Sequence, residues 1–262
     1  MRLAQDSEKE RILELLRRDI HNCIYLYIDI ANYGIFTDNI KVWIEEENSD
    51  ISLILMKYYD SMQLYCAQEA CNMDSVVSVL RQYPVSMISG ERKIIEQLAI
   101  QCPEYHPTYG EVFLMDRYRK MLSDRSVEEA IPDDTKEIAE LICQDKEIGG
   151  HYTTQALAAQ LEERIRTHTG RSYIIRENGI IIAHTATYAE AEGIAVVGGT
   201  IVREAFRNTN AYMTLSNYML EQLAIEGIKA YTFAIAPKMI RYHGLLHKKC
   251  GEYGKMTKVN SI

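Results

Sequence analysis

The stretch AVVGGTIVREAFRNTNAYMTLSNYMLEQL, residues 195–223, runs from an apolar strand pattern through a polar turn into an apolar helix pattern and contains no proline. Its first part predicts a strand over 194–202. The turn that follows has two interpretations. It is either a phosphate-binding loop that has lost two glycines or an ordinary connection between a strand and a helix.

The helix after this turn is predicted over 210–226. Leu215, Met219 and Leu223 recur every fourth residue, so one face of the helix is apolar and packs on a sheet. Gly227 supplies the C-terminal stop, because glycine adopts the left-handed conformation that ends many helices.

A hairpin precedes the strand. RSYIIRENGIIIAHTATY, residues 171–188, consists of two β-rich runs joined at Asn178 and Gly179. This dipeptide best tolerates the positive φ of a two-residue hairpin turn.

Further elements surround this core of the second half. Helices are predicted over 135–143 and 154–167, and KAYTFAIAP, KMIRYHGLLHKK and EYGKMTKV predict a strand, a helix and a last strand. The order is two helices, three strands, helix, strand, helix, strand.

The first half is less regular. The sequence predicts a helix over 8–19, apolar segments over 51–57 and 62–66, a helical window over 73–80, and a short strand, Gly90 and a helix over 91–100. The polar stretch SDRSVEEAIPDDTKE has the composition of a linker. We therefore place a boundary near residue 130, between domains 1–130 and 131–262.

Composition limits the class of protein. The 262 residues are 47% hydrophobic and carry a net charge of −8, which suits a folded acidic protein and argues against general binding to nucleic acid or an anionic membrane. The N-terminal twenty residues lack an apolar signal core, and no run approaches the roughly 20 apolar residues of a membrane span. We expect a soluble, cytoplasmic protein.

The six cysteines are scattered and form no CxxC pair, so we expect reduced thiols rather than a disulfide framework. HKKC, residues 247–250, has the spacing of metal ligands but no second pair to complete a tetrahedral site. We predict no metal.

The element order over 171–259 resembles the GCN5-related N-acetyltransferase (GNAT) superfamily. In that family a strand ends near a valine, here Val202, and a loop of pattern Q/RxxGxG/A opens the next helix. Arg207 and the spacing agree, whereas Asn210 replaces the central glycine and Tyr212 the small residue. Further on, HKKCGE keeps Gly251 of another family pattern but has histidine and glutamate for its aromatic residues.

The layout also looks like two-part bacterial proteins that join a degenerate GNAT-like half to a better preserved one. IANYGIFTDNIKVW, SLILMKYYDSMQLYC and MISGERKIIEQL are similar to the first half of such proteins. The resemblance implies an α/β fold of two GNAT-like mixed-sheet domains, the second better preserved. The first half has no phosphate-loop pattern, and we assign it no cofactor.

The resemblance also implies acetyl-CoA, or coenzyme A, as co-substrate. A helix start presents unpaired N–H groups and a partial positive charge, which suit a diphosphate without any particular side chain. The residues that would hold the coenzyme are Ile201 and Val202 for pantetheine, and Arg207, Asn208, Thr209, Asn210, Ala211 and Tyr212 for the diphosphate.

Two of these residues replace small ones. Asparagine tolerates positive φ better than other non-glycine residues, so Asn210 is an acceptable substitute for glycine. The ring of Tyr212 either fills the phosphate site or rotates away over the helix.

Acyl transfer to an amine also needs proton handling, because an alkyl amine with a pKa of about 10.4 is almost fully protonated at pH 7. Glu190 and Glu192 lie nearest to where the family places a base, and solvated turn residues are the alternative. His247 is the candidate acid for the leaving thiol, with Tyr242 as the alternative, although a surface role fits this histidine too.

The leading hypothesis is an N-acetyltransferase-like protein that transfers an acyl group from acyl-CoA directly to a small-molecule or peptide amine. The rival is a non-catalytic binding or regulatory module that keeps the fold with a worn coenzyme loop. A homodimer that uses free sheet edges is a third, weaker hypothesis.

Overall fold

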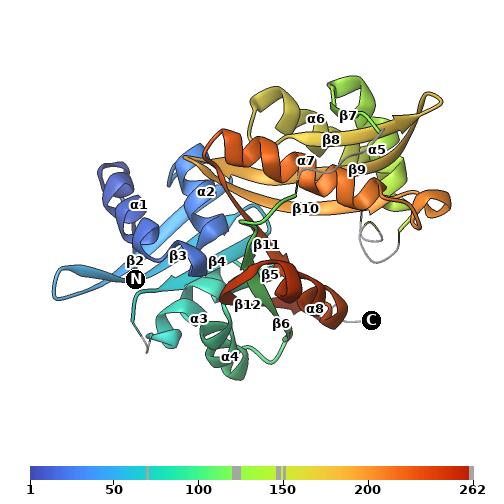
Figure 1. Ribbon diagram of the computed structural model, residues 1–262. Coiled ribbons are helices and arrows are strands. Elements are labelled where there is room, and N and C mark those ends of the chain that lie inside the picture. Colours follow the sequence, from blue (N-terminus) through green and yellow to red (C-terminus); the bar gives the residue numbers. More distant parts are fainter. Residues whose placement is uncertain (69–70, 120–124, 146–148, 150–151, 260–262) are drawn as a thin grey trace. The chain divides into compact units, whose positions relative to one another are not determined.

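The computed structural model describes residues 1–68, 71–119, 125–145, 149 and 152–259. The chain forms two compact units, unit 1 (Met1–Phe113 and Phe233–Ile262) and unit 2 (Leu114–Thr232). Figure 1 labels most of their helices and strands.

Unit 1 contains the first half of the chain together with its C-terminal helix and strand. Its helices and strands are β1 (Arg2–Leu3), α1 (Lys9–Arg18), α2 (Ile24–Tyr33), β2 (Ile40–Glu47), β3 (Asp50–Tyr58), β4 (Ser61–Cys66), α3 (Met73–Gln82), β5 (Met87–Glu91), α4 (Arg92–Gln101), β6 (Tyr105–Leu114), α8 (Pro237–Leu246) and β12 (Lys248–Lys258). A short 3-10 helix, Ile20–Asn22, connects α1 to α2.

The sheet of unit 1 has the strand order β1-β2-β3-β4-β5-β12-β6. From β1 to β4, each strand pairs antiparallel with the next one. Strands β4 and β5 are parallel, and β5 and β12 are antiparallel. Tyr253 of β12 lies opposite Glu91 and Thr257 lies opposite Met87. The last strand predicted for the second half therefore pairs with a strand of the first half.

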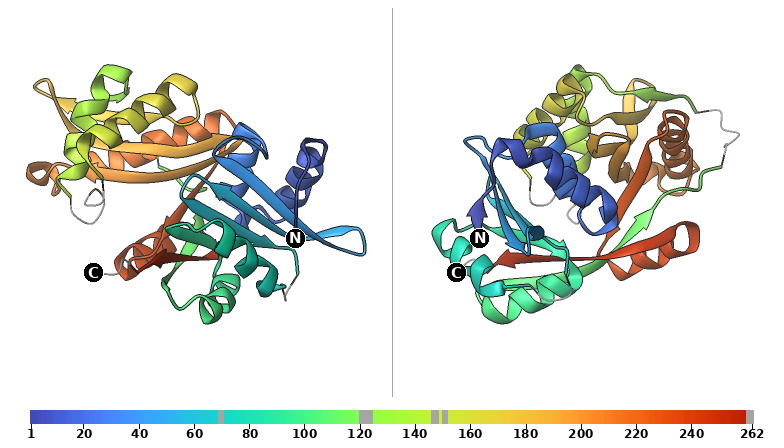
Figure 2. Two further views of the ribbon diagram at one scale, coloured as in Figure 1. Left: turned by 180° about the vertical axis from the view of Figure 1, so that it is seen from behind. Right: turned by 90° about the vertical axis from the view of Figure 1, so that its left-hand side faces the viewer.

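Helices cover both faces of this sheet, with α1 and α2 on one side and α3 and α4 on the other (Figure 2). Strand β3 is consequently buried on both faces, and Leu53, Ile54, Leu55 and Met56 are each 2% exposed or less. This explains why the segment reads as a continuous apolar run rather than as an alternating strand.

Unit 2 contains the core of the second half. Its helices and strands are β7 (Val127–Glu129), α5 (Thr135–Cys143), α6 (Thr154–Thr167), β8 (Ser172–Glu177), β9 (Ile180–Ala191), β10 (Ile194–Val202), α7 (Ala211–Ile225) and most of β11 (Lys229–Ala234). Their order in the sheet is β11-β10-β9-β8-β7. Among these pairs of adjacent strands, as far as the structure describes them, β10 and β11 are parallel and the other pairs are antiparallel.

The helix predicted from the apolar repeat is α7. Leu215, Met219 and Leu223 are fully buried and pack with Ala183 and Val197 of the sheet. Helices α5 and α6 pack in a separate core cluster with other residues of β8, β9 and β10. The sheet of unit 2 thus lies between helices on both faces.

The predicted hairpin is confirmed. Strands β8 and β9 meet at Asn178 and Gly179, whose φ angles are 49° and 79°. These values belong to the positive-φ turn that the Asn-Gly pair favours.

The linker prediction is wrong for part of its length. Val127–Glu129 forms β7, which pairs antiparallel with β8, and Ala130 is 3% exposed. A short strand at a sheet edge is held by backbone bonds, so a polar composition does not exclude it. The division at residue 130 stays a prediction about the two GNAT-like halves, whereas the compact units begin and end elsewhere in the chain.

The expectation of reduced thiols is wrong for one pair. A disulfide joins Cys66 at the end of β4 to Cys71 just before α3. Their Cα atoms are 6.4 Å apart, within the range that a disulfide spans. Among the described residues, Cys23, Cys102, Cys143 and Cys250 form no disulfide.

Candidate functional site

Strands β10 and β11 separate after a short parallel ladder. The ladder pairs Ile194 with Lys229 and ends at Val196 opposite Tyr231, although β10 continues to Val202. On its other side β10 remains paired with β9 up to Val202. The second half of β10 therefore has one backbone edge that β11 does not use, and such an edge accepts an extended ligand as an added strand.

Two glycines shape β10 at this point. The register shifts between Gly198 and Ile201, and Gly199 has a φ of 62°. The ring of Tyr188 from β9 packs over both glycines, and a Cβ atom on Gly198 would lie 2.7 Å from its Cε2. Glycine is required here for the bulge and for the close approach of this ring.

The segment after β10 makes one short helical turn, Glu204–Phe206, and then enters α7 at Ala211. The hydroxyl of Thr209 donates to the carbonyl of Phe206 at 2.7 Å and accepts from the amide of Ala211 at 3.3 Å. Asn208 and Asn210 are exposed residues, and within the described part of the chain their backbone N–H groups donate to no protein acceptor. These donors lie at the start of a 15-residue helix, where an anion is stabilised.

The predicted reason for Asn210 is wrong. Its φ is −77° and its ψ is 1°, so the position does not require the left-handed conformation for which glycine or asparagine is selected. Instead, Oδ1 of Asn210 accepts a hydrogen bond of 3.0 Å from Nε of Arg125. Asn210 therefore holds Arg125, two residues before β7, at the start of α7.

Arg207 is partly committed to the protein. Its Nε donates to the carbonyl of Val202 at 3.2 Å, and its Nη2 lies 3.2 Å from Oδ2 of Asp145. The side chain is nevertheless 54% exposed. Its charge is thus available near the helix start, but bidentate contact with a phosphate would require the Asp145 ion pair to open.

The side chain of Tyr212 packs against the core cluster between α7 and the sheet, as the side chains of Phe206 and Tyr218 also do. The residue is half-buried. This packing favours the second of the two orientations considered for Tyr212, in which the ring turns over the helix.

Glu190, the first candidate base, makes a bidentate ion pair with Arg171. Its two carboxylate oxygens lie 2.9 Å from Nε and 2.8 Å from Nη2 of Arg171, and it also accepts from the hydroxyl of Thr187. The carboxylate of Glu226 binds the same guanidinium at 2.6 Å. Hydrogen bonds with Glu226 and Glu190 raise the pKa of Arg171, and the hydrogen bond with Arg171 lowers the pKa of Glu226. This network favours a structural role for Glu190.

Glu192, the second candidate base, is an exposed residue of the turn between β9 and β10. Its φ is 45° and that of the following Gly193 is 77°, as in a tight hairpin turn. This placement also favours the structural alternative that the sequence left open.

The candidate acids belong to unit 1. Tyr242 lies on α8, and His247 ends that helix. Between them, His243 is 6% exposed, its ring lies 5.7 Å from that of Phe113 and 5.9 Å from that of His247, and burial lowers its pKa to about 4. Tyr242 and His247 are the more accessible members of this group.

Sequence reasoning missed three features of the site. Arg125 and Arg171 act through long-range partners, and nothing local marks them. The bulge in β10 did have a signal, because paired glycines inside a strand pattern indicate a close backbone approach.

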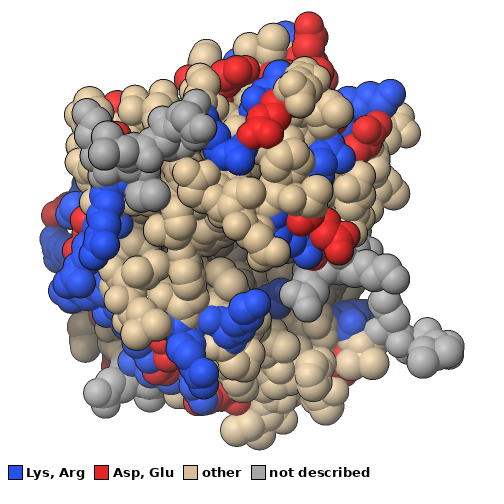
Figure 3. Space-filling model, turned by 45° about the vertical axis from the view of Figure 1, so that its right-hand side comes forward, with Lys and Arg blue, Asp and Glu red and all other residues tan. Residues whose placement is uncertain are grey.

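One face of the molecule shows Lys and Arg side chains interspersed with Asp and Glu rather than a broad field of one sign (Figure 3). The described residues include no group of three or more potential ligands placed to hold a metal ion. No helix in the described part of the chain is long and apolar enough to cross a membrane.

Solved structures share this fold over nearly the whole chain. A Drosophila protein from a structural genomics consortium matches with a TM-score of 0.71 at 12% identity, over 100% of this chain and 99% of that chain. A tandem GNAT protein from the clavulanic acid biosynthesis pathway matches with a TM-score of 0.60 at 12% identity, over 100% and 99%. A GCN5-related N-acetyltransferase from Sphaerobacter thermophilus gives 0.62 at 13%, over 97% and 93%.

No protein-family model matches the chain, and no curated protein does. At 12–13% identity the likeness shows the fold. That fold is a mixed α/β arrangement with a large mixed sheet and helices on its faces. More narrowly, it is the two-part GNAT fold, as the sequence predicted.

Proposed function

We propose that unit 2 binds acyl-CoA, most simply acetyl-CoA, at the end of β10 and the start of α7, and that the protein transfers the acyl group to an amine. The observation that carries the proposal is the separation of β10 from β11 after Val196. It leaves a strand edge for pantetheine next to a helix start for the diphosphate.

The chemistry is direct attack of the amine nitrogen on the thioester carbonyl. A C–N bond forms, the C–S bond breaks, the amine loses a proton and the thiolate leaving group gains one. Thiolate is a good leaving group because the pKa of a thiol is near 8.5, so a weak acid suffices. Tyr242 and His247 stay predictions from the sequence for this acid.

The acceptor is proposed to be a small-molecule or peptide amine. Glu190 is held by Arg171 and Glu192 lies in a turn, which favours structural roles for both carboxylates. An ordered water in the acceptor site, or an amine that arrives neutral, would serve in place of a dedicated carboxylate.

The structural contacts of Glu190 and the turn position of Glu192 favour the rival proposal of a non-catalytic module. If the carboxylates near β10 are structural, the GNAT fold binds a ligand without catalysing transfer. The two proposals share coenzyme binding as a testable step and differ in turnover.

Thermal unfolding of the full chain with and without acetyl-CoA tests the shared step. Acetyl-CoA at 100 times its Kd stabilises the folded state by about 2.7 kcal/mol, which raises Tm by several degrees. Absence of a shift at millimolar acetyl-CoA and longer acyl-CoA would overturn the proposal. Release of free thiol with a panel of amines then separates enzyme from binding module.

A further inference from the structure

A groove of about 370 Å³ lies in unit 1 between the start of α3 and the C-terminal end of α4. We call it the α3–α4 groove. Pockets that bind small molecules begin at about this size.

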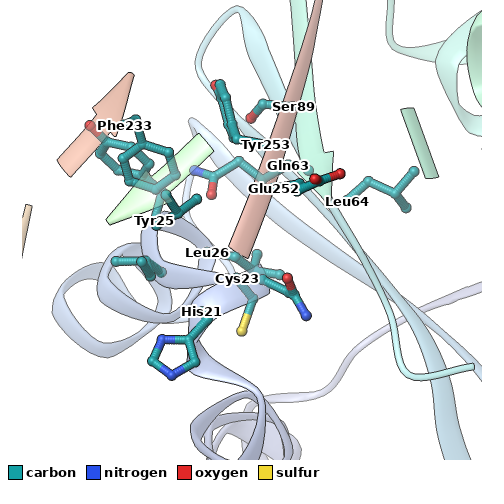
Figure 4. A pocket seen from close by; sticks show the side chains of 14 residues that line it. His21, Cys23, Tyr25, Leu26, Gln63, Leu64, Ser89, Phe233, Glu252 and Tyr253 are labelled. Atoms are coloured by element: carbon teal, nitrogen blue, oxygen red, sulfur yellow. The ribbon is translucent and has the colours of Figure 1, made fainter. Parts of the chain in front are cut away.

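A second hollow of unit 1, at the start of α2, is much smaller. Its volume is about 30 Å³, and Figure 4 shows the side chains that surround it, among them Gln63, Tyr25 and Phe233. This volume has room for water alone. Of these two hollows, the α3–α4 groove is therefore the one that can hold a ligand.

The Cys66–Cys71 disulfide borders the groove, because Cys71 is one of the residues that line it. The two cysteines differ in access. Cys66 is 6% exposed and belongs to the core cluster around α3 and α4, whereas Cys71 is half-buried and packs against that cluster. Thiol–disulfide exchange depends on the access of a thiolate to one of the two sulfur atoms. A thiol that enters the groove therefore reaches Cys71 rather than Cys66.

Three polar side chains of the groove are free to contact a ligand. In the part of the chain that the structure describes, the carboxylate of Asp74 and the amides of Gln97 and Gln101 have no hydrogen-bond or ion-pair partner. Asn72, by contrast, caps α3 and donates to Glu45 at 3.2 Å. Gln97 and Gln101 are four residues apart and thus project from one face of α4.

The lining indicates the chemistry of the ligand. Carboxamides pair with peptide groups and carboxylates, and the carboxylate of Asp74 pairs with an ammonium group. Ile100, which is 83% exposed, offers an apolar contact. The described residues that line the groove include no Lys or Arg, so a ligand with several negative charges would lack a cation there. A short zwitterionic peptide matches this lining.

We propose that the α3–α4 groove binds a small peptide thiol of the glutathione class and presents it to Cys71 for exchange with the Cys66–Cys71 disulfide. The groove makes this disulfide a site of reversible modification. The proposal concerns unit 1 alone and does not depend on acyl transfer or on the coenzyme seat proposed in unit 2.

The exchange takes two steps. The peptide thiolate attacks Sγ of Cys71, an S–S bond forms between them, the Cys66–Cys71 bond breaks, and Cys66 leaves as a thiolate that takes up a proton. A second peptide thiolate attacks the sulfur of the bound peptide, and the peptide disulfide leaves while Cys71 is released as a thiolate. Two peptide thiols are thereby oxidised and one protein disulfide is reduced. Because Cys71 directly precedes the N-cap of α3, the helix start stabilises this second leaving thiolate.

Anaerobic reduction of the oxidised full chain tests the proposal with three thiols: glutathione, 2-mercaptoethanol and coenzyme A. Alkylation and peptide mass spectrometry measure the rate, and division by the rate of the same thiol with hydroxyethyl disulfide corrects for intrinsic reactivity. We expect the glutathione rate to saturate with concentration and, at low concentration, to exceed the other two corrected rates roughly tenfold, as for two added hydrogen bonds. A linear glutathione rate, or a corrected rate for either other thiol that equals or exceeds it, would overturn the proposal.

Substitutions in the groove test its role in binding. Gln97→Ala and Gln101→Ala are each expected to lower the corrected glutathione rate roughly threefold, since each removes one hydrogen bond to the peptide, while the 2-mercaptoethanol rate stays unchanged. Gln82→Ala, at the exposed end of α3 and outside the groove, is the control. Equal losses for both thiols would mean that the glutamines affect the disulfide itself and would refute peptide binding.

Removal of the buried sulfur tests the assignment of Cys71. In Cys66→Ser no second thiol displaces the bound peptide, so a mixed disulfide at Cys71 persists. With oxidised glutathione, we expect Cys71 to be modified roughly tenfold faster than Cys143, which is also half-buried but lies outside the groove. Equal rates at the two cysteines would overturn the proposal. Gln101→Ala changes an exposed residue, so its result stands even if Cys66→Ser destabilises the fold.

Discussion

Arg171 donates to Glu190 from Nε and Nη2 and to Glu226 from Nη1 and Nη2, while its backbone amide donates to the hydroxyl of Thr187 at 2.8 Å. Thr187 in turn donates to Glu190. One arginine therefore connects β8, β9 and the end of α7 in a closed network. A carboxylate held this way is preorganised for structure rather than for proton transfer.

We expect Glu190→Gln to lower the free energy of unfolding by about 1–2 kcal/mol, because a partly buried arginine loses one of its two carboxylate partners. Urea unfolding followed by circular dichroism measures this loss. Glu192→Gln is the control, since Glu192 is an exposed turn residue, and no change is expected. If Glu190→Gln keeps its stability but abolishes acyl transfer, Glu190 is the base after all.

At the start of α7, we expect one substitution to increase the stability of the fold and to weaken acetyl-CoA binding. Asn210→Asp keeps the acceptor for Arg125 and adds a negative charge at a helix N-terminus, which stabilises the helix by about 0.3–1 kcal/mol. The same charge repels a diphosphate, and acetyl-CoA binding is expected to weaken roughly tenfold. Thermal unfolding without and with acetyl-CoA measures both effects.

The same substitution at a corresponding place in unit 1 is the control. Asn72 caps α3 by accepting from the amide of Ser75. Asn72→Asp is expected to leave acetyl-CoA binding unchanged, although repulsion from Glu45, which Asn72 contacts at 3.2 Å, costs some stability. A tenfold loss in both variants would place the coenzyme elsewhere or show a nonspecific charge effect.

The packing of Tyr212 predicts the outcome of its removal. Because the ring packs on the cluster of α7 and the sheet, Tyr212→Ala is expected to lower the free energy of unfolding by about 1–3 kcal/mol and to leave acetyl-CoA binding unchanged or weaker. Isothermal titration measures the binding, with Tyr212→Phe as the control that keeps the ring. Tighter binding in Tyr212→Ala would show that the ring crowds the diphosphate.

Local patterns predicted the elements of the site well. The helix over 154–167, the strand over 194–202 and the turn at Asn178 and Gly179 lie where the sequence placed them, because periodicity, capping and positive φ are properties of neighbouring residues. The apolar stripe of α7 was equally local. These elements, in their order, were enough to predict a GNAT-like fold.

What the sequence could not provide were distances between segments. The partners of Arg171 lie 19 and 55 residues away, so the structural role of Glu190 was invisible. A positive φ was predicted for Asn210 because the family pattern has a glycine at this position. The chain instead enters α7 with a negative φ at Asn210. The separation of β10 from β11 depends on where a parallel ladder ends, and composition carries no sign of that.

Asp29 gives unit 1 a pH dependence. Burial raises its pKa to about 7 in the folded state, against an ordinary value of 3.8 for an aspartate side chain, so between about pH 4 and pH 7 the folded state holds a proton that the unfolded state has released. Stability from this group therefore falls as pH rises through that window, by up to about 1.4 kcal/mol per pH unit. Asp29→Asn removes this slope, as urea unfolding at several pH values would show; an unchanged slope would contradict the assignment.

His184 gives unit 2 a dependence of the opposite sign. The residue is fully buried in β9, its Nε2 lies 3.1 Å from the hydroxyl of Ser172, and burial lowers its pKa to about 4 from 6.5. Between these values the unfolded state binds a proton that the folded state does not. The stability is therefore complete above about pH 6.5 and is lost as pH falls toward 4, by up to about 1.4 kcal/mol per pH unit.

His184→Gln is expected to be less stable at pH 7.5 but to approach the parent protein as pH falls to 4.5, because glutamine has no proton to gain. Urea unfolding across this pH range measures how the difference in the free energy of unfolding between His184→Gln and the parent protein decreases. His168→Asn, at the exposed end of α6 where φ is 55°, is the control and is expected to keep the parent slope, since asparagine accepts that backbone conformation. A constant difference between His184→Gln and the parent at all pH values would mean that another group governs the acid sensitivity of unit 2.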